Sequence, residues 1–503
     1  MRKSKILFKG LSFSYVEYII GIAAPIITMP IALGYFGVEL YGLWLVVNSF
    51  IVFLQFTDLG INLSSQNEIS FSSEIHKQAE IIKKSFLILF GISTIILVLV
   101  WCLHMFSDDW AYVIGIIPEG MYNQIENIIL VMIVYFAITF PLKLSMSIFK
   151  ALQQMHWASI YQVVIRIISI FALIITIVFK YDLFVYAVLI CTGQIIVTVV
   201  STVHLWYSNR QLFREVFNGQ SGKVKYADLL SNGFKFFNMS VSTLIILNAG
   251  NIIINHSLGP AYVTPFAISF RLFYMGIQLT NSIGVVLWPM YAKAKGIADW
   301  SWINSTYKSS MIIHTRLGAM LFLGGILFAE PIIDIWVGPE LFPGFVFIYC
   351  IGAWSYMTSY AGGVLSLLNA IGPTIVQVGI QWFYAIIYIG LSLLMIDKYG
   401  INAVAFALFI GVTLNYISLP YTYVKARTKG HVYYNLSNIV LHFVIILVPS
   451  VILSEIIRRS LSSLQYLITA IGLFIIFVLV SLISVPKAQK ALILGTIRNM
   501  RQS

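Results

Sequence analysis

Charged residues are scarce in this sequence, because only 10% of its 503 residues are Asp, Glu, Lys or Arg. A soluble protein of average composition carries about 25% charged residues. Since 59% of the residues are hydrophobic, the chain has too few polar side chains to cover a surface that faces water. The composition excludes an ordinary soluble domain and indicates a polytopic membrane protein.

Cysteine is rarer still, and the three residues, Cys102, Cys191 and Cys350, are far apart. Each lies in or beside an apolar run, so we expect a packing role for them and neither a metal site nor a disulfide framework. The sequence also lacks a P-loop, a His-Glu-x-x-His motif and a Cys-x-x-Cys motif. No enzyme signature, metal site or cofactor is therefore predicted.

Acidic residues are fewer than basic residues, 19 against 31, which gives a formal net charge of +12. The basic residues form short clusters between apolar runs and no continuous patch, so nucleic acid is not an expected partner. With a cytoplasmic N-terminus, 24 basic residues fall on the cytoplasmic side of the predicted helices and four on the outer side. This asymmetry predicts that both termini are cytoplasmic.

Long apolar runs predict an all-α fold of about fourteen transmembrane helices, each of roughly 20 residues. The runs lie at residues 11–33, 41–62, 85–106, 127–149, 159–179, 183–206, 236–257, 262–290, 311–335, 343–368, 374–396, 401–423, 436–456 and 463–485. We expect four segments: a six-helix bundle at 1–206, a basic cytoplasmic linker at 207–235, a second six-helix bundle at 236–424, and two helices with a basic tail at 425–503.

The linker at 207–235 carries a pattern of its own. On a helix, apolar side chains would share one face and arginines the opposite face, namely Leu212, Phe213, Val216 and Phe217 against Arg210 and Arg214. The pattern is typical of an amphipathic helix at the membrane interface. An ordinary basic connector is an equal alternative.

The two halves of the sequence resemble each other weakly. Leu33–Glu39 corresponds to Leu258–Ala261, and Phe149–Gln153 corresponds to Leu368–Gly372. Internal repeats are common in secondary transporters, where the substrate path lies between the repeats. The repeat therefore predicts a transporter.

Among the ionisable residues inside the predicted helices, five are the candidates for a functional role: Glu17, Asp58, Arg166, Arg271 and Arg316. A charge at a helix centre costs about 2.5–3.5 kcal/mol on insertion scales, so such residues usually face a cavity or a partner. Three arginines against two acids favour an anionic cargo over a lipophilic cation.

Short motifs connect this chain to a known family. Leu-Gly-x-x-Gly-x-x-x-Tyr-Gly spans residues 33–42, and Thr57-Asp58-Leu59-Gly60 follows it. Phe270-Arg271 and Leu368-Asn369-Ala370-Ile371-Gly372 lie in the second half. With these motifs the sequence resembles, essentially from end to end, the polysaccharide transport family of the multidrug/oligosaccharidyl-lipid/polysaccharide (MOP) exporter superfamily.

The resemblance implies a flippase in the bacterial inner (plasma) membrane. Its cargo would be an undecaprenyl-diphosphate-linked oligosaccharide, an O-antigen or capsule repeat unit, which alternating access moves from the cytoplasmic to the outer leaflet. The lipid bilayer, a polymerase and a chain-length regulator are the implied partners. No cofactor is implied, although coupling to protons or sodium ions is an open alternative.

A diphosphate cargo assigns roles to the ionisable residues. Arginine binds phosphate oxygens with a planar fork that stays charged, so Arg166, Arg271 and Arg316 are predicted to contact the diphosphate. The alternative is that each arginine pairs with Glu17, Asp58 or a backbone carbonyl to hold helices together. For Glu17 and Asp58, ion coupling and a counter-ion role are both open, and Asp58 is expected chiefly to fix the local structure.

Two rival functions remain open. A cation-coupled drug or toxin exporter of the same superfamily would share the plan of two bundles, but a lipophilic cation favours carboxylates in the lumen. A membrane polysaccharide polymerase or ligase would need a large outer loop, and the longest predicted outer loop runs only from Ser107 to Glu126. The sequence therefore favours the flippase.

Overall fold

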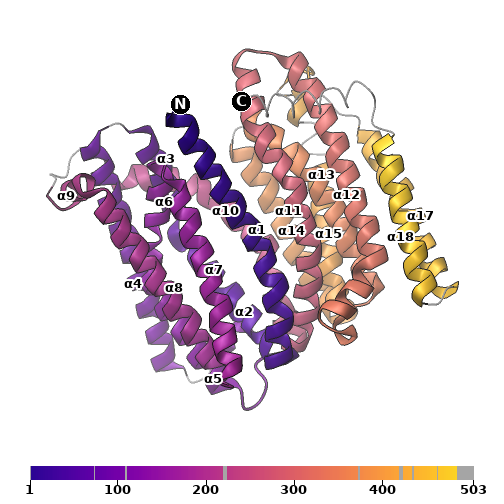
Figure 1. Ribbon diagram of the computed structural model, residues 1–503, viewed down its shortest axis with the longest axis horizontal. Helices are drawn as coiled ribbons and strands as arrows, with labels where there is room; N and C mark the ends of the chain where they lie inside the picture. Colours follow the sequence, from indigo (N-terminus) through magenta and orange to yellow (C-terminus); the bar gives the residue numbers. More distant parts are fainter. Residues whose placement is uncertain are drawn as a thin grey trace. The chain divides into compact units, whose positions relative to one another are not determined.

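The computed structural model of the protein describes residues 2–72, 74–107, 110–218, 224–371, 374–417, 423–426, 428–432, 436–460 and 463–483. Throughout these ranges the regular structure is helical and contains no β-strand (Figure 1). The predicted all-α fold class is therefore confirmed.

The chain divides into two compact units, Met1–Thr264 and Pro265–Ser503. The helices of the first unit are α1 (Arg2–Phe36), α2 (Val38–Gln55), α3 (Ile61–Phe71), α4 (Ile75–Phe106), α5 (Tyr122–Leu142), α6 (Leu144–Ala151), α7 (Met155–Val178), α8 (Leu183–Ser208), α9 (Arg210–Asn218) and α10 (Tyr226–Leu258). Two 3-10 turns, η1 (Phe56–Asp58) and η2 (Trp110–Ile114), complete this unit.

The second unit contains most of α11 (Pro260–Gly296) and the helices after it. These are α12 (Trp300–Trp336), α13 (Phe345–Ile371), α14 (Thr374–Tyr399), α15 (Ile401–Ile417), α17 (Leu436–Ser460) and α18 (Ser463–Ile483), with the 3-10 turn η3 (Pro339–Leu341) before α13. Helices α13, α17 and α18 all pack against α12.

Nine helical segments in the described ranges are long and apolar enough to cross a membrane. They are Val16–Phe36, Val38–Gln55, Ile75–Phe106, Tyr122–Ala151, Met155–Val178, Leu183–Ser208, Ser240–Leu258, Trp300–Trp336 and Val376–Tyr399. The chain is thus a multi-pass membrane protein, as its composition predicts. The count of about fourteen spans and the four predicted segment boundaries stay predictions.

Several helices begin well before the apolar run that predicts them. α4 begins at Ile75, although its run begins at residue 85, and α12 begins at Trp300, although its run begins at residue 311. A helix can continue for several turns beyond the hydrocarbon core, where its side chains are polar. Hydropathy detects only the part that is immersed in the core.

The predicted helix at 41–62 is wrong at its end, because α2 stops at Gln55. Leu59 and Gly60 follow in the left-handed region, with φ angles of 50° and 72°. A Cβ atom at Gly60 would lie only 2.1 Å from the carbonyl oxygen of Gly233, so glycine is required for α3 to start against α10. The chain therefore turns here and begins a separate helix.

The predicted linker contains the helix that its pattern indicates, since α9 spans Arg210–Asn218. Its buried Leu212 joins a core that also draws side chains from α3, α4, α5, α6, α8 and α10, among them Ile61, Ile81, Phe136, Phe149, Leu205 and Leu229. The helix is therefore confirmed, and its location at the membrane interface, as opposed to an ordinary basic connector, stays a prediction.

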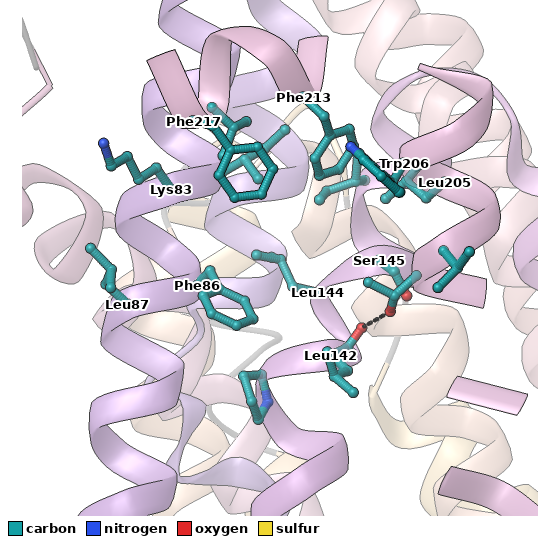
Figure 2. Close-up of a pocket in the computed structure, with 16 residues that line it drawn as sticks. Lys83, Phe86, Leu87, Leu142, Leu144, Ser145, Leu205, Trp206, Phe213 and Phe217 are labelled. Atoms are coloured by element: carbon teal, nitrogen blue, oxygen red, sulfur yellow. Dashed lines mark hydrogen bonds between the residues drawn. The ribbon is translucent and has the colours of Figure 1, made fainter. Parts of the chain in front are cut away.

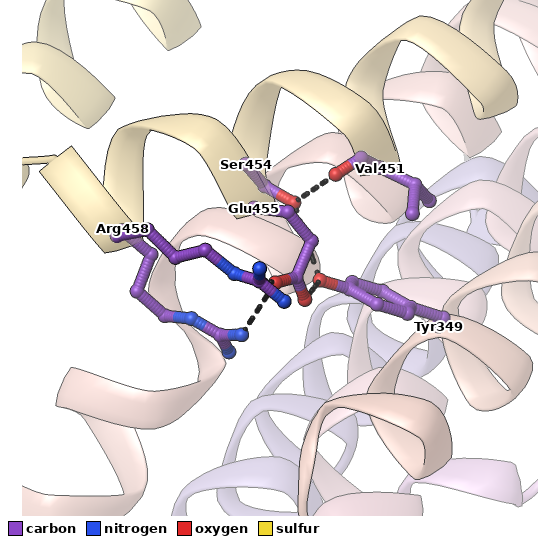
Figure 3. Close-up of polar contacts among 6 residues, drawn as sticks. Tyr349, Val451, Ser454, Glu455 and Arg458 are labelled. Atoms are coloured by element: carbon purple, nitrogen blue, oxygen red, sulfur yellow. Dashed lines mark hydrogen bonds and ion pairs between the residues drawn. The ribbon is translucent and has the colours of Figure 1, made fainter.

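A polar cluster holds α17 against α13 in the second unit (Figure 3). The hydroxyl of Tyr349 donates a 2.6 Å hydrogen bond to Oε1 of Glu455, and Nη2 of Arg458 lies 2.7 Å from Oε2 of the same carboxylate. The guanidinium of Arg458 also stacks over the ring of Phe345, 3.4 Å from its centroid. The first of the two additional C-terminal helices is thus fastened to the bundle.

Candidate functional site

Arg166 lies where α7 packs against α1. A Cβ atom added to Gly21 of α1 would be 3.2 Å from Nη2 of Arg166 and 3.3 Å from its Cζ. The guanidinium therefore rests against the backbone of α1, in a space that exists because residue 21 has no side chain. Its Nε atom is buried and lacks a hydrogen-bond partner within the described structure.

Glu17 lies on α1, one turn before Gly21, and is half-buried. An ion pair between this acid and Arg166 was one predicted alternative. Among the ion pairs formed by the described residues, none includes Glu17 or Arg166. The structure thus places the guanidinium of Arg166 one turn from Glu17 along α1, and no ion pair of the described residues joins the two side chains.

Arg316 is bound differently. Its Nη1 atom donates a 2.8 Å hydrogen bond to the backbone carbonyl oxygen of Ser481, which joins α12 to α18. This is the carbonyl partner that the sequence allowed as an alternative to the diphosphate. The structure gives Arg316 a role in packing, and its contact with a cargo stays a prediction.

Arg271 is half-buried on α11, next to an aromatic stack. The ring of the preceding residue, Phe270, stacks on Trp354 of α13 at a centroid distance of 5.0 Å. The Nε1 atom of Trp354 donates a 2.7 Å hydrogen bond to the hydroxyl of Tyr384 on α14. These contacts fix the backbone that carries Arg271 within the second unit, and its contact with the diphosphate stays a prediction.

Asp58 is engaged in a local turn. One carboxylate oxygen accepts a 2.9 Å hydrogen bond from the backbone N–H of Gly60, and the other accepts a 2.9 Å bond from Nδ2 of Asn62. Both donors lie in the segment that separates α2 from the body of α3. The geometry therefore supports the expected structural role of Asp58 and leaves ion coupling as the untested alternative.

A buried polar group, the histidine that the sequence places beside Arg316, lies on the same helix. His314 is completely buried, and its Nδ1–H donates a 2.8 Å hydrogen bond to the carbonyl oxygen of Ser310. Its Nε2 atom has no hydrogen-bond partner in the described structure. A Cβ atom at Gly363 would lie 3.2 Å from the imidazole, so α13 needs a glycine there to pass this ring. In the sequence, the signal for this group is a histidine inside the apolar run at 311–335.

Residues 7–295 of the chain match the family model described as "Polysaccharide biosynthesis protein". The chain belongs to this family. The match covers more than half of the sequence, including Arg166, Arg271, Glu17 and Asp58, and Arg316 lies beyond its end. The family prediction made from the motifs is confirmed.

The chain is also similar to a curated relative and to two solved structures. The relative is a Salmonella typhimurium strain LT2 protein named "Putative O-antigen transporter", which is 21% identical over 232 residues. The aligned region is 43% of this chain and 51% of the relative, so the chain spans about half the length of the curated relative it matches.

The two structures share the fold of this polysaccharide biosynthesis protein. The lipid II flippase MurJ in an inward closed conformation has a TM-score of 0.70 and 16% identity, with 97% of this chain and 99% of that chain covered. An inward-facing multidrug resistance MATE family transporter of the MOP superfamily has a TM-score of 0.68 and 14% identity, with 81% and 95% covered. The chain therefore has the fold of these two transporters.

Proposed function

We propose that the protein is a flippase for a polyprenyl-diphosphate-linked oligosaccharide, an O-antigen or capsule repeat unit. It moves this lipid by alternating access from the cytoplasmic to the outer leaflet of the bacterial inner membrane, with both of its own termini in the cytoplasm. Family membership, the name of the Salmonella relative and the fold shared with a lipid II flippase support the proposal. A polymerase and a chain-length regulator are proposed as partners in the same process.

One observation carries the proposal furthest: the guanidinium of Arg166 is placed against Gly21 without an acidic partner within the described structure. A charge inside a membrane helix is costly without a counter-ion, so an intramembrane arginine of this kind usually serves an anionic ligand or a cavity. A diphosphate suits this position, because guanidinium binds phosphate oxygens with two parallel hydrogen bonds.

Arg271 and Arg316 are proposed to hold the same diphosphate at a later or earlier stage of transport. Both lie in the second unit, and Arg166 lies in the first. Each unit therefore supplies at least one arginine that is proposed to contact the diphosphate.

Glu17 is proposed to couple transport to protons or sodium ions. It is a half-buried acid on α1, one turn from the glycine that Arg166 contacts, and the same helix contains Pro25 and Pro30. Prolines remove backbone hydrogen bonds and allow a membrane helix to bend. A change in the charge of Glu17 would therefore act on a helix that can change its shape.

The second candidate is a cation-coupled drug or toxin exporter, which the fold shared with the MATE transporter favours. Lipophilic cations need carboxylates in their path, whereas the helices of this chain contain more arginines than acids at depth. The electrostatic balance therefore supports the flippase over the drug exporter.

Complementation tests the proposal. The wild type and Arg271→Ala are expressed in bacteria that lack their own O-antigen flippase and carry the repeat-unit genes that accompany this protein. We expect the wild type to restore repeat units on the outer leaflet, and the variant to leave them inside at equal protein level. No restoration by the wild type, together with increased resistance to lipophilic cations, would favour the exporter.

A further inference from the structure

A cavity of about 550 Å³ lies in the first unit between α4, α5, α6, α8 and α9 (Figure 2). Its rear wall is made of buried side chains of the core of this unit, including Ile82, Leu144 and Leu205. None of the five ionisable residues assigned to cargo or coupling lines it. The cavity is thus separate from the site described above, and its volume falls in the range of about 300–1,000 Å³ that ligand pockets have.

The amphipathic helix α9 forms one wall of the cavity. Its Phe213 and Val216 pack against the core of the unit, and Phe217 faces the cavity although 72% of its surface is exposed. Trp206, at the end of α8, lines the same part of the cavity and is 51% exposed. Large exposed aromatic groups around an open cavity indicate that hydrocarbon, and not water, covers them in the native membrane.

The hydroxyl groups in the lining already have partners. Ser145 shares a 3.1 Å hydrogen bond with Ser201, and Thr202 donates a 2.9 Å bond to the carbonyl oxygen of Thr198. The other lining groups are apolar, apart from one lysine. The interior therefore offers almost no polar group to a sugar or a drug, and it suits a hydrocarbon chain.

Lys83 is the charged residue of the lining, and it lies at the edge of the cavity. In Figure 2 its amino group points away from the rings of Phe213 and Trp206. Its neighbour Lys84 forms a 2.8 Å ion pair with Glu80, whereas no ion pair of the described residues includes Lys83. A single cation at the mouth of an apolar cavity is complementary to the phosphate of a lipid.

We propose that this cavity binds one acyl chain of an anionic phospholipid, whose phosphate group contacts Lys83. The charge distribution of the sequence places this end of α4 in the cytoplasmic leaflet, which supplies anionic lipids, and basic pockets between helices on that side bind lipid head groups. The bound lipid would fill the space beneath α9 and hold this helix on the bilayer. The site is structural and separate from transport of the cargo.

Native mass spectrometry of the full-length protein tests the proposal, with phosphatidylglycerol and phosphatidylethanolamine as probes. We expect one retained phosphatidylglycerol, and Lys83→Gln should weaken its binding about fivefold, because one lysine near an anionic lipid surface is worth about 1 kcal/mol. Val216→Trp narrows the cavity and should weaken retention of phosphatidylglycerol. Lys77→Gln removes an exposed charge from the same helix outside the lining and should change nothing.

A second measurement needs no variant. Phosphatidylglycerol with a diazirine at the end of one acyl chain should label the peptides that contain Trp206 and Phe213 after irradiation in vesicles. Labelling elsewhere, or equal retention of phosphatidylglycerol by Lys83→Gln and Lys77→Gln, would overturn the proposal. It would also be overturned if undecaprenyl phosphate displaced the probe at equal concentration, because the cavity would then belong to the cargo.

Discussion

The guanidinium of Arg166 lies against Gly21, at the point where α7 crosses α1. The contact depends on the absence of a side chain, because a Cβ atom at residue 21 would stand 3.2 Å from Nη2. The absence of a side chain at residue 21 therefore makes room for the guanidinium, and no ion pair among the described residues includes Arg166. Gly21 lies one turn after Glu17 on α1, so the proposed cargo contact and the proposed coupling acid share this helix.

Gly21→Val should displace this guanidinium and impair transport as Arg166→Ala does. The branched side chain occupies the space of the guanidinium, whereas Gly34→Val on the same helix has no neighbour within 4 Å to displace. Complementation at matched protein level is the measurement. Equal transport by both glycine variants would show that the position of Arg166 does not matter.

Arg316→Ala should destabilise the protein by about 1.5–3 kcal/mol, the usual contribution of a hydrogen bond from a charged group. The variant leaves the carbonyl oxygen of Ser481 without this donor and loosens α18 from α12. Thermal unfolding in detergent measures the loss. Lys293→Ala, an exposed position on α11, is the control and should change the stability by less than about 0.5 kcal/mol. An unchanged melting temperature for Arg316→Ala would show that the bond to Ser481 does not stabilise the protein, and cargo binding would remain as the proposed role of Arg316.

Asp58→Asn should preserve transport, because an amide oxygen can still accept the hydrogen bond from the backbone of Gly60. Asp58→Ala removes both acceptors and should lower the amount of folded protein in the membrane. Quantitative immunoblotting and complementation separate the two effects. Loss of transport in Asp58→Asn at normal protein level would mean that the charge itself is needed, as an ion-coupling role requires.

Tyr349→Phe should lower the stability of the second unit by about 1–2 kcal/mol, because the carboxylate of Glu455 loses a 2.6 Å hydrogen bond. Arg459→Ala is a matched control, since Arg459 lies 3.5 Å from the same carboxylate and its side chain is 81% exposed. Exposed ion pairs of this kind contribute about 0–1 kcal/mol. Equal thermal shifts for the two variants would show that the Tyr349 contact does not fasten α17.

Hydropathy and charge predict the membrane class and the all-α fold, because both depend on composition, and the family follows from the resemblance of short motifs. The same reasoning misses the turn at Leu59 and Gly60, since apolar residues continue through it and only the approach of Gly233 reveals why the helix must stop. It also cannot find that Arg316 bonds to Ser481, because the two residues are 165 positions apart.

Placement of a charge inside a predicted helix is readable from sequence, but the partner of that charge is not. Arg166 and Arg316 looked equivalent, and the structure separates them into one side chain against a glycine and one bound to a carbonyl oxygen. The difference arises from which helix each one packs against. A single sequence contains no information on that packing beyond the apolar pattern.

Transport in reconstituted liposomes tests the central claim most directly. Purified wild type, Arg166→Ala and Arg166→Lys are each incorporated into vesicles that carry a polyprenyl-diphosphate-linked oligosaccharide, and a glycosidase added outside reports the lipid that reaches the outer leaflet. We expect the wild type to accelerate this transfer over protein-free vesicles, and Arg166→Ala to be at least about tenfold slower, since charged hydrogen bonds to phosphate are worth about 1.5–3 kcal/mol. Arg166→Lys should fall between them. A wild type that does not accelerate the transfer, but carries a lipophilic cation across the same vesicles, would contradict the account.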